Sequence, residues 1–333
     1  MINRVAIVGA PGAVGRELLD LFAEGRLPAV EVKAYASHAE HGTLLAHDDE
    51  PLVVLDLEKE VDPFAGIDVA FFFGDAEAAR RHVAEALRTG AVVIDGTGAH
   101  VRETHVQLTI AGVNWRRATD AWPLYLVPSS LATIAGTVLL PLHQAFGLRR
   151  VAMSSYQSVS SLGRPAMDDL FEQSVSIARG QEPIPVMFEH QIAYNLIPWI
   201  GAILSDGEST EEKEVGYQLT RLLEVPALDV SMACVRVPVF IGEAATVTVE
   251  TERPVDLRTA HETLDQVSII TVVRDCTKDR LDPLRAGLEE NVLVGRVRVD
   301  AAVGNRLHFF VVADNLRRGS ALNAIEIASR HFA

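Results

Sequence analysis

Residues 5–15 have the sequence VAIVGAPGAVG, and this stretch decides the fold of the first third of the chain. Val5–Val8 is an apolar run typical of a buried strand, and the apolar positions that follow recur at the spacing of one helix face. A loop with the spacing G-x-x-G-x-x-G lies between the strand and the helix. Its residues are Gly9, Ala10, Pro11, Gly12, Ala13, Val14 and Gly15.

A glycine loop in this position is suited to phosphate. Glycine allows a tight turn and a close approach of backbone to a pyrophosphate, while the helix N-terminus offers free N–H groups and a positive dipole end. The spacing alone is weak evidence, but its place between the first strand and the first helix strengthens it. We predict that the seven loop residues bind a dinucleotide; the alternative is a tight turn that holds no ligand.

The first 130 residues alternate short apolar strands with helical stretches. This order predicts an α/β fold with a Rossmann-like, doubly wound parallel sheet. Helices are expected at Ala76–Arg88 and Leu131–Phe146. The further strands are expected at Val30–Ala36, Leu52–Leu57, Asp68–Phe73, Ala91–Asp95 and Leu124–Val127.

After about residue 149 the strands become longer and alternate apolar with polar residues. This pattern is typical of half-buried antiparallel strands and predicts an α+β domain. A second subunit would cover the free face of its sheet. The strands are expected at Val151–Val159, Ser231–Phe240, Ala244–Glu250, Leu293–Val299 and Arg306–Val312, and the helices at Thr210–Leu223, Asp256–Leu264 and Asn315–His331.

The composition excludes several classes of protein. The net charge is -15 and no block of lysine or arginine occurs, which argues against nucleic acid and against an anionic membrane surface. The two cysteines, Cys234 and Cys276, give no disulfide framework, so we expect a cytoplasmic protein. No apolar run is long enough to span a bilayer, and the N-terminus lacks a signal-peptide pattern.

The segment after the second strand bears on the choice of dinucleotide. A carboxylate there suits the ribose hydroxyls of NAD, and an arginine suits the extra phosphate of NADP. Residues 36–42 contain Ser37, a candidate cofactor ligand, no arginine, and one late acid, Glu40. NAD and NADP both remain open at this point.

Motifs spread along nearly the whole chain resemble those of the aspartate-semialdehyde dehydrogenase family. They are Gly9–Gly15, Val93–Asp95, Gly112–Asn114, Ser155–Ser160, Cys234–Val239, Val294–Arg298 and Ala313–Leu316. The resemblance implies an NADP-binding domain to which the C-terminal helix returns, at residues 1–130 plus 316–333. It implies a substrate and dimerisation domain at residues 131–315, a homodimer, and a small-molecule substrate. The implied reaction reduces aspartyl phosphate to the semialdehyde through a cysteine thioester.

The nucleophile of that family is missing from its expected place. The family motif resembles Pro-Asn-Cys-Ser-Thr-Ile, whereas residues 128–134 are PSSLATI, so the cysteine position falls on Ser130 or Leu131. A thiolate is accessible near neutral pH, whereas a serine needs a strong base. We expect Cys234 to be a buried strand residue and Cys276 to lie in a loop. The chain thus resembles the paralogue branch that lacks the catalytic cysteine.

Other family positions are partly kept. Arg236 matches the arginine that binds the substrate carboxylate, and Gln157 matches the glutamine that orients the acyl carbonyl. The general-base histidine falls on Glu243. Three family cations fall on Val101, Glu214 and Ala39, with Arg102 and Lys213 adjacent to the first two. The plainer alternatives are an interface ion pair for Arg236, a backbone-bonded strand end for Gln157 and a helix N-cap for Ser130.

Three hypotheses follow from these residues. The first is a dinucleotide-binding homodimer of the family that has lost most aspartate-semialdehyde dehydrogenase activity, with Ser130, Gln157 and Glu243 as catalytic candidates and Arg236 as a substrate ligand. The second is an oxidoreductase that transfers hydride directly, without a covalent intermediate. The third is a non-catalytic protein that senses a ligand or pairs with an active paralogue.

Overall fold

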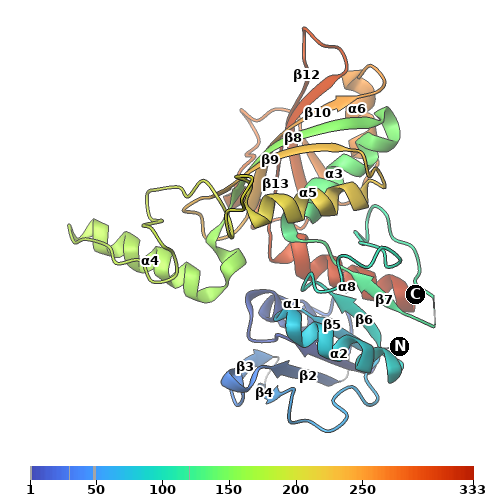
Figure 1. Ribbon diagram of the computed structural model, residues 1–333, viewed down its shortest axis with the longest axis vertical. Coiled ribbons are helices and arrows are strands. Elements are labelled where there is room, and N and C mark those ends of the chain that lie inside the picture. Colours follow the sequence, from blue (N-terminus) through green and yellow to red (C-terminus); the bar gives the residue numbers. More distant parts are fainter. Residues whose placement is uncertain (1, 30, 48–49, 120) are drawn as a thin grey trace. The chain divides into compact units, whose positions relative to one another are not determined.

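The computed structural model describes residues 2–29, 31–47, 50–119 and 121–333. The chain divides into two compact units (Figure 1). The first unit comprises Met1–Ser129 and Ser320–Ala333, and the second comprises Ser130–Gly319. Across the described ranges, no helix combines the length and the apolar character needed to cross a membrane.

The first unit is built on a seven-stranded sheet with the order β3-β4-β2-β1-β5-β6-β7. All neighbouring pairs are parallel except β3 with β4, so the predicted doubly wound sheet is confirmed. The elements are β1 (Arg4–Val8), α1 (Ala13–Ala23), β2 (Glu31–Ala36), β3 (Leu44–His47), β4 (Glu50–Asp56), β5 (Val69–Phe72), α2 (Ala76–Arg88), β6 (Val92–Asp95), β7 (Leu124–Leu126) and α8 (Leu322–Phe332). The predicted start of the second strand, Val30, lies outside the described residues.

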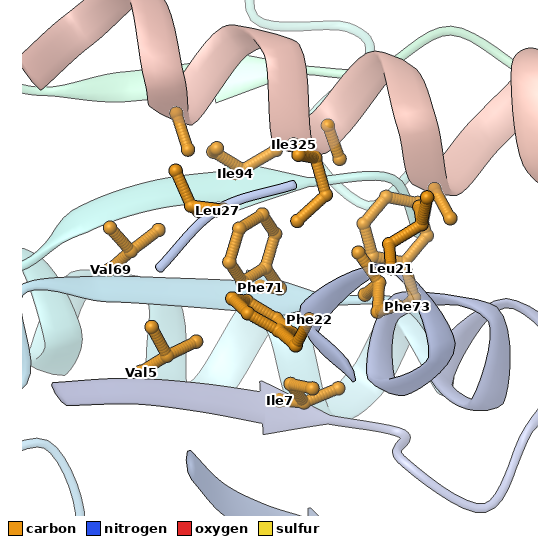
Figure 2. Packing of buried hydrophobic residues seen from close by; sticks show 14 of the residues in the cluster. Val5, Ile7, Leu21, Phe22, Leu27, Val69, Phe71, Phe73, Ile94 and Ile325 are labelled. Atoms are coloured by element: carbon orange, nitrogen blue, oxygen red, sulfur yellow. The ribbon is translucent and has the colours of Figure 1, made fainter. Parts of the chain in front are cut away.

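The core of this unit lies between the sheet and the helices α1 and α8 (Figure 2). Phe22 of α1 and Phe71 of β5 meet edge to face, with ring centroids 6.0 Å apart. Ile325 of α8 belongs to the same cluster as Ile94 of β6. Full burial of such a side chain stabilises the fold by about 1.5–3 kcal/mol, so the C-terminal helix is an integral part of this unit.

The second unit contains a six-stranded sheet with the order β11-β12-β13-β10-β8-β9. The helices α3, α5 and α6 lie along it in Figure 1. The elements are α3 (Ser130–Phe146), β8 (Leu148–Gln157), α4 (Arg164–Ala178), α5 (Thr210–Leu222), β9 (Asp229–Arg236), β10 (Glu243–Thr251), α6 (Leu257–Asp265), β11 (Ile270–Val273), α7 (Pro283–Ala286), β12 (Val292–Val299) and β13 (Arg306–Ala313).

This sheet is mainly antiparallel, as predicted, but two of its strand pairs are parallel. β8 pairs with β9 and β11 with β12 in the parallel sense. The long connection from β8 to β9 allows this, because a parallel pair needs a crossover of a dozen residues or more. Sequence reasoning missed α4, which lies in that connection, and the short strands β3 and β11. The predicted last helix, Asn315–His331, begins as a π-helical turn at Arg317–Ala321 before α8.

We expect the first glycine of the loop to be indispensable for steric reasons. Gly9 has φ +90°, and a Cβ there would lie 2.2 Å from the Phe73 carbonyl oxygen. Gly90 also has φ +90° but meets nothing within 4 Å, which makes it a matched control. Gly90→Ala should lower the free energy of unfolding by about 1–2 kcal/mol, and Gly9→Ala by about 1–3 kcal/mol more. Urea titration measures both losses, and equal losses would contradict the steric argument.

Candidate functional site

In the glycine loop of the first unit, a different steric contact requires glycine at each of the three glycine positions. Gly9 turns the chain beside β5, and a Cβ on Gly15 would lie 2.4 Å from the Gly9 carbonyl oxygen. Gly12 is the N-cap of α1 and supplies no side-chain cap, so the first N–H groups of the helix are left for another acceptor. The nearest atom to a Cβ on Gly12 would be the Gly9 carbonyl oxygen, at 3.1 Å. The backbone geometry of the loop is therefore suited to binding a phosphate group.

A cavity of about 240 Å³ lies beside this loop within the first unit. Gly9 and Gly12 line one side of it, and Ser37 lines it after β2. The other loop residues contribute differently. Ala10 is fully buried, and the Pro11 carbonyl accepts a hydrogen bond from Arg16 Nε at 2.9 Å. Ala13, Val14 and Gly15 form the first turn of α1.

The charges around Ser37 are mostly paired with one another. The Ser37 hydroxyl donates to Glu40 Oε2 at 3.2 Å. Arg81 Nη1 lies 3.0 Å from Glu58 Oε1, and Lys59 Nζ lies 3.5 Å from Asp56 Oδ2. A phosphate at this place would have to displace an existing ion pair, whereas a ribose hydroxyl could donate to Glu40.

Three candidate residues of the second unit lie in one row across its sheet. Gln157 of β8 pairs with Arg236 of β9 on one side and with Glu243 of β10 on the other. Glu243 also pairs with Ala313 of β13. Residues directly opposite each other on neighbouring strands point to the same face. The strand ends therefore bring three distant motifs of the sequence together.

Glu243 is the acidic group of this row, and its pKa is strongly shifted. It is fully buried, and its Oε2 accepts a hydrogen bond of 2.7 Å from the Ser130 hydroxyl at the start of α3. Its Oε1 has no hydrogen-bond partner. Burial raises the pKa of Glu243 to about 7; the Ser130 bond opposes that rise and the nearby Glu211 adds to it. The hydroxyl at the start of α3 thus bonds to a carboxyl group at the start of β10, and this carboxyl group can exchange a proton near neutral pH.

Arg236 is 4% exposed, and its Nη1 donates to the Ser158 carbonyl and to the Ser161 hydroxyl. Burial lowers the pKa of Arg236, while the charges of Glu243 and Glu211 act in the opposite direction. The guanidinium also lines a cavity of about 220 Å³ within the second unit. Apolar and aromatic side chains supply much of its lining, namely Leu162, Met187, Phe188, Ile197, Trp199 and Ile200. A buried cation beside such a wall is suited to an anionic ligand.

Glu211 is a site residue that the sequence reasoning missed. Gln157 Nε2 donates to Glu211 Oε1 at 3.4 Å and to the Ser155 hydroxyl at 3.3 Å. Burial raises the pKa of Glu211 as well. The signal was present in the capping box of Ser209 and Glu212, which places the intervening acid in the first turn of α5.

Asn315 links the segments next to the row of Gln157, Arg236 and Glu243 by hydrogen bonds. Its Oδ1 accepts from the Gly242 backbone N–H at 2.8 Å and from the hydroxyls of Ser158 and Ser160 at 3.2 Å. All three side chains are buried. Because an unsatisfied buried group costs about 1–3 kcal/mol, this network fixes the segments that carry Gln157 and Glu243.

Neither cysteine lies at the position of Ser130, although Cys234 is two residues before Arg236 on β9. Cys234 is fully buried, and burial raises the pKa of its thiol to about 12; Cys276 is exposed. Val101 is buried, and Lys213 forms an ion pair with Asp206.

In the described ranges, no group of three or more histidine, cysteine, aspartate or glutamate side chains is arranged to hold a metal ion.

The fold and these sites define a two-domain protein of the dinucleotide-binding class. The model of the semialdehyde dehydrogenase NAD binding domain matches residues 4–121, and that of the semialdehyde dehydrogenase dimerisation domain matches residues 139–318. The chain belongs to the semialdehyde dehydrogenase family. Its first unit is accordingly an NAD(P)-binding domain.

Relatives of known name support the same assignment over the full length. The chain is 34% identical to an aspartate-semialdehyde dehydrogenase of Aquifex aeolicus, over 98% of this chain and 96% of the relative. A crystal structure of aspartate semialdehyde dehydrogenase II from Vibrio cholerae, complexed with ASA, superposes with a TM-score of 0.91 at 31% identity. It covers 99% of this chain and 98% of that chain. The Candida albicans enzyme with NADP, at 20% identity and a TM-score of 0.75, shares the fold.

We predict that NAD binds more tightly than NADP, because the cations near Ser37 are already paired and Glu40 can accept from a ribose hydroxyl. Glu40→Gln should weaken NAD binding about tenfold, the value of one charge-assisted hydrogen bond. Glu24→Gln, at the exposed opposite end of α1, is the charge-matched control. Calorimetric titration with both dinucleotides measures the affinities. Tighter binding of NADP would contradict the prediction.

Because the carboxyl group of Glu243 is buried, we predict that replacing it with an uncharged amide stabilises the protein by an amount that depends on pH. The pKa of Glu243 is raised from 4.5 to about 7 in the folded protein, so its favourable protonated state is lost as the pH rises through 7. The advantage of Glu243→Gln over the native protein should therefore grow by roughly 2.5 kcal/mol between pH 5 and pH 8. Urea titrations at several pH values measure it. Glu172→Gln, an exposed change on α4, should show no such growth; a pH-independent difference for Glu243→Gln would refute this reasoning.

Proposed function

We propose that this chain is a homodimeric, dinucleotide-binding member of its family that has lost most aspartate-semialdehyde dehydrogenase activity. One observation carries the proposal. Ser130, one of the two positions where the family resemblance implies a cysteine, is bonded to Glu243, where it implies a histidine. The proposal therefore places the chain in the branch that lacks the catalytic thiol.

The chemistry of the nucleophile supports this loss. A thioester forms readily from a thiolate and accepts hydride well, whereas a serine ester is a poorer acceptor. Cys234 lies two residues before Arg236 on β9, but its side chain is buried among carboxylates and its pKa is raised to about 12. A thiol held protonated in this way is a weak nucleophile at neutral pH. Cys276 follows β11 and is exposed.

The bound nicotinamide dinucleotide would supply hydride chemistry, and the chain would contribute positioning. The glycine loop would hold the pyrophosphate, and Ser37 and Glu40 would contact the ribose. Arg236 would bind an anionic group of a small-molecule substrate, and Gln157 would orient a carbonyl. These roles follow from the cavities that these residues line and from the row that Gln157, Arg236 and Glu243 share.

Two features of the second unit support the proposal that the protein is a homodimer. It carries the family's dimerisation domain, and large apolar side chains are exposed on α4 and on the segment that follows it. These are Phe171, Ile184, Val186, Met187, Tyr194 and Leu196. Apolar groups gathered on one segment are typical of a protein interface. We propose that a second copy covers them in a cytoplasmic dimer.

A second candidate function is direct hydride transfer to a carbonyl without a covalent intermediate. The pKa of Glu243, about 7, favours it, because a proton donor works best when its pKa is near the operating pH. Gln157 and Arg236 would polarise and position the substrate. Turnover of a ketone or a hydroxy acid would favour this reading, whereas dinucleotide binding with no turnover of any carbonyl compound would favour a ligand-sensing or partner protein.

The proposal predicts almost no phosphate-dependent oxidation of aspartate semialdehyde. With NAD or NADP, turnover should stay below about 0.01 s⁻¹, roughly a thousandth of a median enzyme value, because neither Ser130 nor Leu131 supplies a thiol at the nucleophile position. The absorbance of the reduced cofactor measures the rate. Calorimetric titration of the same preparation serves as the control, since it shows that the cofactor site is intact. Turnover at an ordinary enzymatic rate would refute the loss of activity.

A further inference from the structure

The Ser130–Glu243 pair has the parts of a nucleophile and its base. Ser130 is partly exposed and is the first residue of α3, while Glu243 is wholly buried on β10. The hydroxyl donates to Oε2 over 2.7 Å, and Oε1 is buried with no partner of its own. A buried oxygen without a partner is costly in a purely structural carboxyl group, and such a cost is typical of functional sites.

We propose that Ser130 and Glu243 hydrolyse small activated acyl compounds, such as acyl phosphates, through an acyl-serine intermediate. The activity needs no dinucleotide, so it goes beyond the function proposed above. It also suits a chain whose candidate nucleophile is a serine rather than a cysteine. An ester on serine accepts hydride poorly, but water can still cleave it.

The two half-reactions balance without any further reactant. Ser130 Oγ attacks the acyl carbon while its proton passes to Glu243; a C–O bond forms to Oγ, and the C–O bond to phosphate breaks. The phosphate leaves and takes up that proton. A water molecule then attacks the ester, Glu243 receives the proton of the water, and the bond to Oγ breaks. The proton returns to Oγ, and the carboxylic acid is released.

The surroundings of Ser130 favour the attack. The positive end of the α3 macrodipole lies at this residue and stabilises negative charge that develops on Oγ or on the acyl oxygen. Gly319 packs against Ser130 on one side, where an added Cβ would lie 2.9 Å from the serine Cβ. The buried guanidinium of Arg236, in the same strand row as Glu243, adds a fixed positive charge that suits an anionic acyl donor.

The titration of Glu243 sets the pH range of this chemistry. The pKa is about 7, so the carboxylate form that accepts the proton predominates at pH 8. The charged groups that act on Glu243 are Glu211 of α5, Arg236 of β9 and Asp314 after β13. Glu211 and Asp314 raise the pKa of Glu243, and Arg236 lowers it. A base with this pKa is as strong as histidine.

The test uses the full chain, without dinucleotide, and acetyl phosphate as the probe. Phosphate release should exceed the uncatalysed rate and rise with pH to a plateau above pH 7. Ser130→Ala and Glu243→Gln should each lower the rate by about a hundredfold or more, and the residual rate of Glu243→Gln should lose the rise near pH 7. Ser154→Ala, on the exposed opposite face of β8, is the matched control and should keep the native rate.

Mass spectrometry after an acid quench gives a second readout. One acetyl group should be found on the peptide that contains Ser130, and it should be absent from Ser130→Ala. Circular dichroism confirms that both variants fold. Phosphate release at the background rate, native release by Ser130→Ala, or an acetyl group found only on Cys276 would each overturn the proposal.

Discussion

The structure of the candidate site in the second unit depends on the burial of one carboxyl group. Glu243 begins β10 in the middle of a mixed sheet, where water cannot solvate its charge. The neighbouring groups satisfy the buried carboxyl group only in part, since Ser130 donates one hydrogen bond to Oε2 and Oε1 receives none. The result is a pKa of about 7 for Glu243, which shares its row with Gln157 and Arg236.

The candidate site of each unit is organised by strand ends. In the first unit, the turn from β1 into α1 is so crowded that Gly9 and Gly15 leave no room for a side chain. In the second unit, β8, β9 and β13 end and β10 begins at one level, and Asn315 ties the flanking segments there. Both arrangements place backbone or polar groups where regular hydrogen bonding stops, which is where a ligand can still be bound.

The fold could be predicted largely from the sequence, because hydrophobic periodicity and the glycine loop are local signals. Short elements were missed: Leu44–His47 and Ile270–Val273 have four residues each, too few for a clear period. The parallel pairing of β8 with β9 could not be predicted, since strand direction depends on the path of the connection. The sequence motifs named Gln157, Arg236 and Glu243, but the bond from Ser130 to Glu243 and the approach of Glu211 are contacts between distant segments and have no local signature.

The parallel pairing of β8 and β9 has a consequence for how the protein can diverge. Residues 158–228 connect the end of β8 to the strand that ends at Arg236, and this long connection carries α4 and α5 without interrupting the row. Insertions or rearrangements around α4 would leave the spacing of the polar side chains on the sheet unchanged. Evolution could therefore remodel the exposed apolar surface of α4 and the wall of the apolar cavity while the row of Gln157, Arg236 and Glu243 stays constant.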